Sequence, residues 1–113
     1  MQMPPSISVE ELAERLASQF GALQLIDVRE PEEVEIVEIE GFTNLPMSQV
    51  NEWIPQILDR FDPDVETLVI CHHGIRSAYV CQWLTMQGFT KIFNVAGGID
   101  AYAIVVDRTL PRY

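Results

Sequence analysis

The stretch that decides the fold reads Leu68-Val69-Ile70-Cys71-His72-His73-Gly74-Ile75-Arg76-Ser77. Its first three residues form an apolar run that predicts a short buried strand. A polar loop containing one glycine follows, and the apolar spacing from Ser77 onward predicts a helix that Gly88 ends. A strand that leads through a short loop into a helix is typical of α/β domains.

The same alternation continues on both sides of this stretch. Ser8 and Glu11 form a capping-box pattern that predicts the start of a helix, which Gly21 ends. Pro31 fits the first turn of a short helix. Ser48 is predicted to cap a further helix, which Pro55 bends or divides. Strands are predicted in residues 23–28, 68–70 and 92–95, a briefly extended segment in 41–47, and a last helix in 99–106. The pattern indicates an α/β domain with a parallel sheet.

Length and charge limit the classes of function. The chain has 113 residues, which suits one domain covering residues 1–113 with its core in about 6–106. Seventeen acidic against seven basic residues give a net charge of −10, so neither nucleic acid nor an anionic membrane is an expected partner. A small local site for an anion remains compatible with this charge.

Features of targeting and of cysteine content favour the cytoplasm. No segment approaches the roughly 20 apolar residues that cross a bilayer. Residues 1–6 lack the basic and apolar regions of a signal peptide. Two cysteines, Cys71 and Cys81, are too few for a disulfide framework, so we expect a reducing cytoplasm.

The loop after the 68–70 strand carries the chemistry. In open α/β sheets, ligands bind at the carboxyl ends of the strands, and Cys71 is predicted to lie there. Backbone N–H groups of the loop and the start of the next helix form an anion nest that favours a thiolate. Gly74 permits the necessary backbone conformation, and Arg76 supplies a bidentate donor for an oxyanion.

Simpler interpretations apply to some of these residues. Cys81 shares a helix face with Ala78 and Leu84 and is predicted to be a core residue. His72 and His73 fit solvated loop positions, or positions that tune the thiolate. Because adjacent histidines seldom converge on one ion and further Cys or His ligands are lacking, we expect no metal site.

Three blocks of sequence resemble the rhodanese-like sulfurtransferases. The loop at residues 71–77 is similar to the active loop of that family, and residues 25–33 (Leu-Ile-Asp-Val-Arg-Glu-Pro-Glu-Glu) are similar to its second signature. Residues 93–101 (Phe-Asn-Val-Ala-Gly-Gly-Ile-Asp-Ala) resemble its closing motif. The blocks occur in the family's order, and the resemblance covers about residues 6–106.

The resemblance implies a rhodanese-like three-layer fold, with a central parallel sheet of about five strands flanked by helices on both faces. It implies that Cys71 takes a sulfane sulfur from a small anionic donor such as thiosulfate, holds it as a persulfide, and passes it to a thiophilic acceptor. No external cofactor is implied. Asp27 and Arg29 are expected to brace the site through ion pairs. Besides Cys71, the resemblance and the loop predict these donor-binding residues: Arg76, His72, His73, Gly74, Ile75 and Ser77.

Loop length and local substitutions refine this resemblance. Four residues lie between Cys71 and Arg76, whereas the related thiol phosphatases have one residue more, which accommodates phosphate. The shorter loop favours sulfur. The family often has histidine where this chain has Glu38, a small residue where it has Phe42, and tryptophan near Tyr102. These differences concern the packing beside the site rather than the nucleophile.

The acidic segment 27–40 holds seven carboxylates and one arginine. It is either a solvated surface or a docking face for a basic protein that delivers or accepts sulfur. A small thiol is the other possible acceptor. Two functions compete with sulfur transfer: a non-catalytic interaction module that uses the acidic surface, and a thiol-dependent phosphatase.

Overall fold

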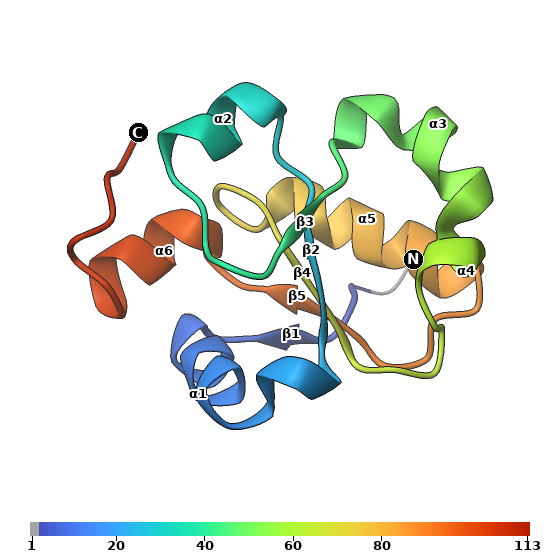
Figure 1. The fold of residues 1–113 in the computed structure, drawn as a ribbon, viewed down its shortest axis with the longest axis horizontal. Helices are drawn as coiled ribbons and strands as arrows, with labels where there is room; N and C mark the ends of the chain where they lie inside the picture. Colours follow the sequence, from blue (N-terminus) through green and yellow to red (C-terminus); the bar gives the residue numbers. More distant parts are fainter. Residues whose placement is uncertain (1–2) are drawn as a thin grey trace.

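The computed structural model describes residues 3–113, and in these residues the fold is built on one five-stranded parallel sheet (Figure 1). The strands lie in the order β1-β5-β4-β2-β3. Their bounds are β1 Ser6–Ile7, β2 Gln24–Asp27, β3 Thr43–Asn44, β4 Thr67–Ile70 and β5 Ile92–Val95. All pairings are parallel. Met1 and Gln2, which the predicted domain includes, lie outside the described residues.

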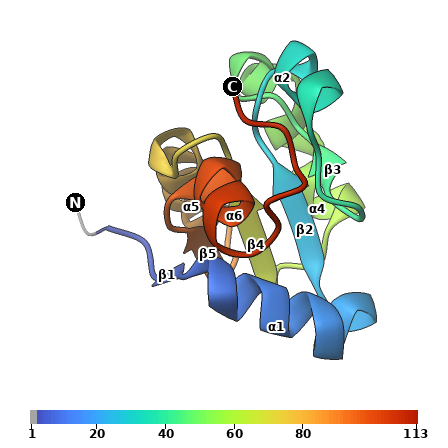
Figure 2. The same cartoon turned by 90° about the vertical axis from the view of Figure 1, so that its left-hand side faces the viewer.

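Helices cover both faces of the sheet, which confirms the predicted three-layer α/β fold. They are α1 Val9–Gln19, α2 Pro31–Ile36, α3 Val50–Trp53, α4 Ile57–Arg60, α5 Ile75–Met86 and α6 Gly98–Val105. Short 3₁₀ turns occupy Phe20–Ala22, Met47–Gln49 and Ile54–Gln56. Helices α1 and α6 contact each other along one side, and α5 packs against β4 and β5 (Figure 2).

Each face of the sheet buries its own apolar core. Val69 contributes to the core that also contains Trp53, Ile57 and Leu84, from α3, α4 and α5. Leu68 and Ile70 contribute to the opposite core with Leu12 and Ile99, from α1 and α6. All four residues of β4 are buried, as expected for a central parallel strand covered on both sides. The predicted apolar run therefore becomes the middle of the fold.

Several predicted local features are confirmed. The Ser8 hydroxyl accepts the N–H of Glu11 and the Glu11 carboxylate accepts the N–H of Ser8, which completes the capping box of α1. Pro31 occupies the first turn of α2. Pro55 lies in the 3₁₀ turn that separates α3 from α4, so the predicted bend divides the helix. No helix in residues 3–113 has both the length and the apolar character needed to cross a membrane.

Other local predictions were wrong. Ser48 does not cap a helix, because it lies inside a 3₁₀ turn and its hydroxyl donates to Glu30 instead. Helix α3 begins at Val50. Helix α5 begins at Ile75, two residues before the predicted start, and α6 begins at Gly98 rather than Ile99. Strand β1 was not predicted, since its two residues are too short to produce a pattern.

The start of α6 holds the loop after β4 in place. The N–H of Ile99 donates to the carbonyl of Cys71 at 2.9 Å, and the N–H of Asp100 donates to that of His72 at 3.1 Å. Gly98 allows this close approach, because a Cβ there would overlap both carbonyl oxygens and its φ is +62°. The loop at residues 71–74 is thus fixed by a helix that begins only at Gly98.

Substitution of Gly98 by alanine should therefore destabilise the fold strongly. The added Cβ meets backbone oxygens, which cannot move aside as a flexible side chain would. We expect Gly98→Ala to lower the free energy of unfolding, measured with urea, by more than about 2 kcal/mol. The control is Gly21→Ala, where a Cβ meets nothing within 4 Å. Equal effects of the two substitutions would contradict this account of the loop.

Candidate active site

The sulfur of Cys71 lies in a ring of hydrogen-bond donors at the carboxyl end of β4. Cys71 is 1% exposed. Its Sγ accepts the N–H of Gly74 at 3.0 Å and the N–H of Ser77 at 3.4 Å, and the Ser77 hydroxyl lies 3.2 Å away. These N–H groups belong to the N-cap and the first turn of α5, so the N-terminus of this helix points at the sulfur. The arrangement favours an anionic sulfur, either a thiolate or a persulfide.

Gly74 shapes this ring. It adopts the left-handed conformation, with φ at +94°, and stands at the N-cap of α5. A Cβ on Gly74 would lie 3.1 Å from the Gly97 nitrogen and 3.2 Å from the Val95 oxygen, which is tighter than usual contacts. The glycine thus turns its own N–H toward the sulfur while the chain packs closely against the end of β5.

Asn94, on β5, connects the two sides of the loop, and the sequence analysis assigned it no role. Its Nδ2 donates to the Gly74 carbonyl at 3.0 Å, and its Oδ1 accepts the Ser77 hydroxyl. Ser77 has one hydroxyl proton, so it donates either to Asn94 or to the Cys71 sulfur. Asn94 is 7% exposed. The available signal in the sequence was a polar amide within an otherwise apolar strand, since such a residue needs hydrogen-bond partners when it is buried.

Arg76 does not point freely into the loop, because Glu33 on α2 binds it. Nη1 donates to Oε1 at 2.6 Å and Nη2 donates to Oε2 at 2.9 Å, a bidentate ion pair. Mainly through this hydrogen bonding, Arg76 lowers the pKa of Glu33 to about 2, and Glu33 raises the pKa of Arg76. The predicted anion ligand therefore already carries a carboxylate, and three of its five N–H groups are not used by Glu33.

Tyr113 also reaches the site, although no sequence motif indicated it. Its hydroxyl donates to Glu33 at 2.7 Å and accepts from Nη1 of Arg29 at 3.2 Å. Its ring stacks on the His72 ring with centroids 3.9 Å apart and planes 6° apart. The segment after α6 thus lies beside the loop that holds Cys71.

Asp27 and Arg29 form a buried ion pair at the end of β2. Nη2 of Arg29 donates to Oδ2 of Asp27 at 2.7 Å, and Nε donates to both carboxylate oxygens at 3.0 and 3.1 Å. Arg29 also donates to the carbonyls of Glu33 and Val37, at 3.2 and 2.8 Å. Neither side chain touches Cys71, so the pair fixes α2 rather than the sulfur.

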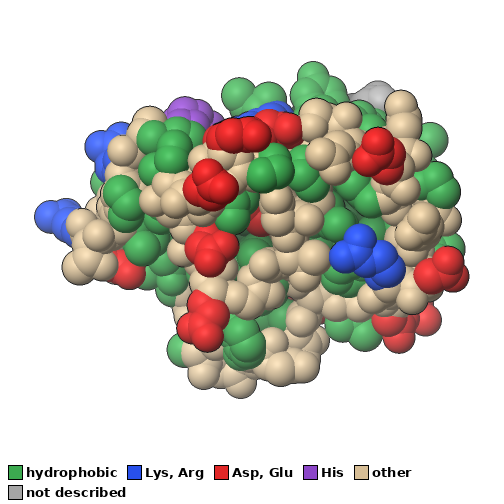
Figure 3. Space-filling view, turned by 45° about the horizontal axis from the view of Figure 1, so that its top comes forward, with side chains coloured by type: hydrophobic (Ala, Val, Ile, Leu, Met, Phe, Trp, Pro, Cys, Tyr) green, Lys and Arg blue, Asp and Glu red, His purple; other side chains and the backbone are tan. Residues whose placement is uncertain are grey.

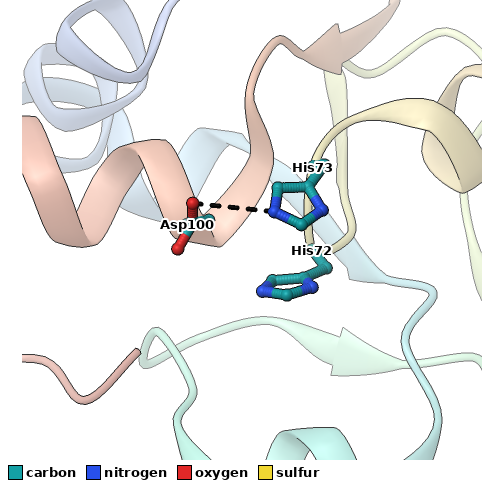
Figure 4. A group of neighbouring side chains, drawn as sticks. All are labelled: His72, His73 and Asp100. Atoms are coloured by element: carbon teal, nitrogen blue, oxygen red, sulfur yellow. Dashed lines mark ion pairs between the residues drawn. The ribbon is translucent and has the colours of Figure 1, made fainter. Parts of the chain in front are cut away.

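His72 and His73 lie on the outer side of the loop, next to Asp100 on α6 (Figure 4). Nε2 of His73 is 3.6 Å from Asp100, and ligand atoms of the three residues lie within 4.8 Å of one another. Asp100 had no predicted role, because its closeness to the two histidines depends on how α6 packs beside the loop. Both oxygens of Asp100 accept from Arg112, at 2.9 and 3.2 Å, so a cation already occupies this carboxylate. Burial lowers the pKa of His72.

Ile75 points away from the sulfur. Its side chain is 69% exposed and lies beside an apolar groove on the outer face of α5. The groove has a volume of about 330 Å³ and is lined by Met3, Gly74, Ile75, Ala78, Tyr79 and Gln82. Its apolar residues begin directly beside the loop.

Cys81 is a core residue, as predicted. It has no exposed surface and lies in the core on the α5 side of the sheet. Burial raises its pKa to about 12, so it remains a protonated thiol at ordinary pH. The two cysteines are therefore chemically distinct.

The residues that depart from the family pattern either pack against the core or lie at the surface. Phe42 and Tyr102 pack against the core on the α1 and α6 side, where each fills space with an aromatic ring. Glu38 is exposed. It belongs to an acidic face, which we define as the exposed carboxylates Glu32, Glu35, Glu38 and Glu40 of α2 and the segment after it. Figure 3 shows acidic side chains spread over this part of the surface.

Comparisons with known proteins agree with this fold. A family model described as "Rhodanese-like domain" matches residues 8–104. The "Rhodanese-like/PpiC domain-containing protein 12, chloroplastic" of Arabidopsis thaliana is 42% identical over 109 residues, which are 95% of this chain and 36% of the plant protein. The chain thus spans about a third of that relative's length.

A bacterial relative and a solved structure match over most of their lengths. A protein named "Sulfurtransferase" from Allochromatium vinosum is 34% identical over 101 residues, which are 89% of this chain and 90% of the relative. The crystal structure of a rhodanese-like domain protein from Staphylococcus aureus superposes with a TM-score of 0.76 at 30% identity, covering 96% of this chain and 98% of the other.

Asn94 should be required for the stability of the loop. Asn94→Ala removes the acceptor of Ser77 and the donor to the Gly74 carbonyl, and leaves buried polar groups without partners. We expect the free energy of unfolding to fall by about 1–3 kcal/mol, measured with urea. Exposed Asn51, on α3, provides the control, since Asn51→Ala should change it by less than about 0.5 kcal/mol. A loss no larger than the control's would show that Asn94 does not hold the loop.

The ion pair of Glu33 with Arg76 should persist into acid. Because the pKa of Glu33 falls from 4.5 to about 2 on folding, its contribution to stability is complete above pH 4.5 and is lost as the pH falls toward about 2. We expect the difference in unfolding free energy between wild type and Glu33→Gln to be constant near neutral pH and to shrink below pH 4.5. Urea titrations across this range measure it, and a difference that stays unchanged down to about pH 2 would refute the pairing.

Proposed function

Because the chain belongs to the rhodanese-like domain family, we propose that it is a sulfurtransferase that carries a sulfane sulfur on Cys71. The observation that carries the proposal is the pair of backbone N–H groups, of Gly74 and Ser77, that donate to Sγ of Cys71. The relative from Allochromatium vinosum that is named a sulfurtransferase supports the same reaction class.

In the first step, the Cys71 thiolate attacks the outer sulfur of the donor. With thiosulfate, the simplest small anionic donor, a new S–S bond forms to Cys71 and the S–S bond of thiosulfate breaks. Sulfite leaves with the electron pair. The negative charge then rests on the outer sulfur of the persulfide, which is bonded to the Sγ toward which the N–H groups of Gly74 and Ser77 point.

Residues around the loop have proposed roles in binding the donor. Arg76 is proposed to bind oxygen atoms of the donor through Nη1 and Nη2, the two nitrogens that donate to Glu33 in this structure. His72 and His73 form the outer wall beside Tyr113, and Ile75 forms the apolar edge. Asp27 and Arg29 keep α2, and therefore Glu33, at its distance from the loop.

In the second step, a nucleophilic acceptor attacks the outer sulfur, and Cys71 leaves as a thiolate. The step needs no cofactor and no oxidant, because the S–S bond of the persulfide breaks as the outer sulfur forms a bond to the acceptor. This new bond is S–S with a thiol and S–C with cyanide. Cyanide and small thiols are suitable acceptors. A basic protein is a further one, since the acidic face lies close to the loop through the contact of α2 with Arg76.

The chemistry also bears on where the chain works. Cys71 must be a free thiol at the start of each cycle, so the proposal places this domain in a reducing compartment, with the cytoplasm as the expected one.

Removing the sulfur of Cys71 should abolish the reaction. We expect Cys71→Ser to lower thiocyanate formation from thiosulfate and cyanide by at least about a thousandfold, because the persulfide cannot form. Cys81→Ser is the matched control and should retain activity near the wild-type level in the folded fraction, since Cys81 lies in the core.

Equal rates of thiocyanate formation in wild type and Cys71→Ser would contradict the proposal. A protein that gains sulfur from no donor, yet binds a basic protein stably, would instead assign the fold to a non-catalytic interaction module. Hydrolysis of an aryl phosphate that depends on Cys71 would point to a phosphatase, which the short loop opposes.

A further inference from the structure

Arg76 already binds an anionic group with two oxygen atoms, which is the kind of group that it is expected to bind in a sulfur donor. The two oxygens of the Glu33 carboxylate accept from Nη1 and Nη2 at 2.6 and 2.9 Å. Two oxygens of a sulfonate group, as in thiosulfate, would use the same two nitrogens in the same plane. Glu33 therefore stands where the oxyanion of a free anionic donor would bind.

Glu33 is held in this position by other contacts. Its Oε2 also accepts the Tyr113 hydroxyl at 2.7 Å, and its Oε1 accepts the N–H of Glu30 at 3.1 Å. Its backbone carbonyl accepts from buried Arg29. Tyr113 is in turn fixed by its stacking on His72. The carboxylate thus belongs to an ordered frame and is not a mobile surface group.

The other arginines beside the loop are also neutralised. Within residues 3–113, Arg29 pairs with Asp27 and Arg112 pairs with Asp100. Each of these two cations, like Arg76, has its own carboxylate. A free dianion that approaches Cys71 therefore meets no arginine with an uncompensated charge, in a protein whose net charge is −10.

We propose that Glu33 determines the donor specificity of this site: it occupies Arg76 and disfavours free oxyanion donors such as thiosulfate relative to alkyl persulfides. The inference rests on the sulfur-transfer function proposed above. Thiosulfate must displace Glu33 before its sulfonate can accept from Nη1 and Nη2 of Arg76 together. An alkyl persulfide has no sulfonate, so it needs only the N–H groups around Sγ.

The transfer from an alkyl persulfide balances without any further reactant. The Cys71 thiolate attacks the terminal sulfur of the donor, and the S–S bond of the donor breaks. The alkyl thiolate leaves with the electron pair, and the terminal sulfur remains on Cys71.

The test compares two donors in three proteins: wild type, Glu33→Gln and the control Glu32→Gln. Glu32 is exposed on the same turn of α2, and its substitution changes the net charge equally. We expect Glu33→Gln to lower KM for thiosulfate by about threefold to tenfold, with kcat changed less than about twofold. KM for 2-hydroxyethyl persulfide, whose alkyl part is uncharged, should change less than about twofold in every variant.

A binding measurement separates this inference from the reaction itself. Sulfate, an unreactive dianion, is titrated into the same three proteins, and the amide NMR signals of Gly74, Arg76 and Ser77 are followed. Sulfate should bind Glu33→Gln at least about threefold more tightly than wild type, and Glu32→Gln like wild type. If no variant transfers sulfur, the proposed function fails, and the sulfate result still decides the role of Glu33.

Two outcomes would overturn the role of Glu33. One is an unchanged or higher KM for thiosulfate in Glu33→Gln together with unchanged sulfate binding, which would show that Glu33 orients Arg76 rather than competing with the donor. The other is an equal change in KM for thiosulfate and in sulfate binding in Glu32→Gln, which would show that the loss of one negative charge, and not the position of Glu33, causes the effect.

Discussion

A guanidinium group with no exposed surface must find an acceptor for each of its N–H groups, and Arg29 imposes this constraint on the fold. The Asp27 carboxylate, the carbonyls of Glu33 and Val37, and the Tyr113 hydroxyl accept its five N–H groups. Because these acceptors come from β2, α2 and the segment after α6, one buried side chain fixes three parts of the chain. Removing the Asp27 carboxylate would leave this charge buried without its partner, which is among the most destabilising changes known.

The frame around Arg29 also positions groups that surround the Cys71 loop. It places Glu33 opposite Arg76 and Tyr113 against His72, while the start of α6 holds the carbonyls of Cys71 and His72. The sulfur is left with backbone N–H groups as its principal donors. Such donors suit a single anionic sulfur atom, and we propose that the pairing of Arg76 with Glu33 disfavours free dianions at the same loop.

Local sequence was sufficient to predict the elements that depend on neighbouring residues. The capping box at Ser8, the buried strand before Cys71 and the core position of Cys81 follow from short-range patterns, and the structure has all three. The three-layer fold with its parallel sheet was predicted from the alternation of helices and strands together with the family resemblance.

Contacts between distant parts of the chain could not be predicted in this way. The partner of Arg76 lies 43 positions away and that of the Ser77 hydroxyl lies 17 positions away. Ser48 had the composition of a helix cap, but it lies inside the 3₁₀ turn Met47–Gln49 and its hydroxyl donates to Glu30 from another element. Tyr113 carried no motif, since its role depends on how the last segment folds back beside His72.

The central claim is that Cys71 carries sulfur as a persulfide, and intact-mass measurement tests it most directly. The protein is treated with thiosulfate or with an alkyl persulfide, and its mass is compared before and after a reductant. The account predicts the gain of one sulfur atom in wild type and Cys81→Ser, reversed by the reductant, and no gain in Cys71→Ser. Wild-type protein that gains no sulfur from either donor, or gains it equally in Cys71→Ser, would contradict the account.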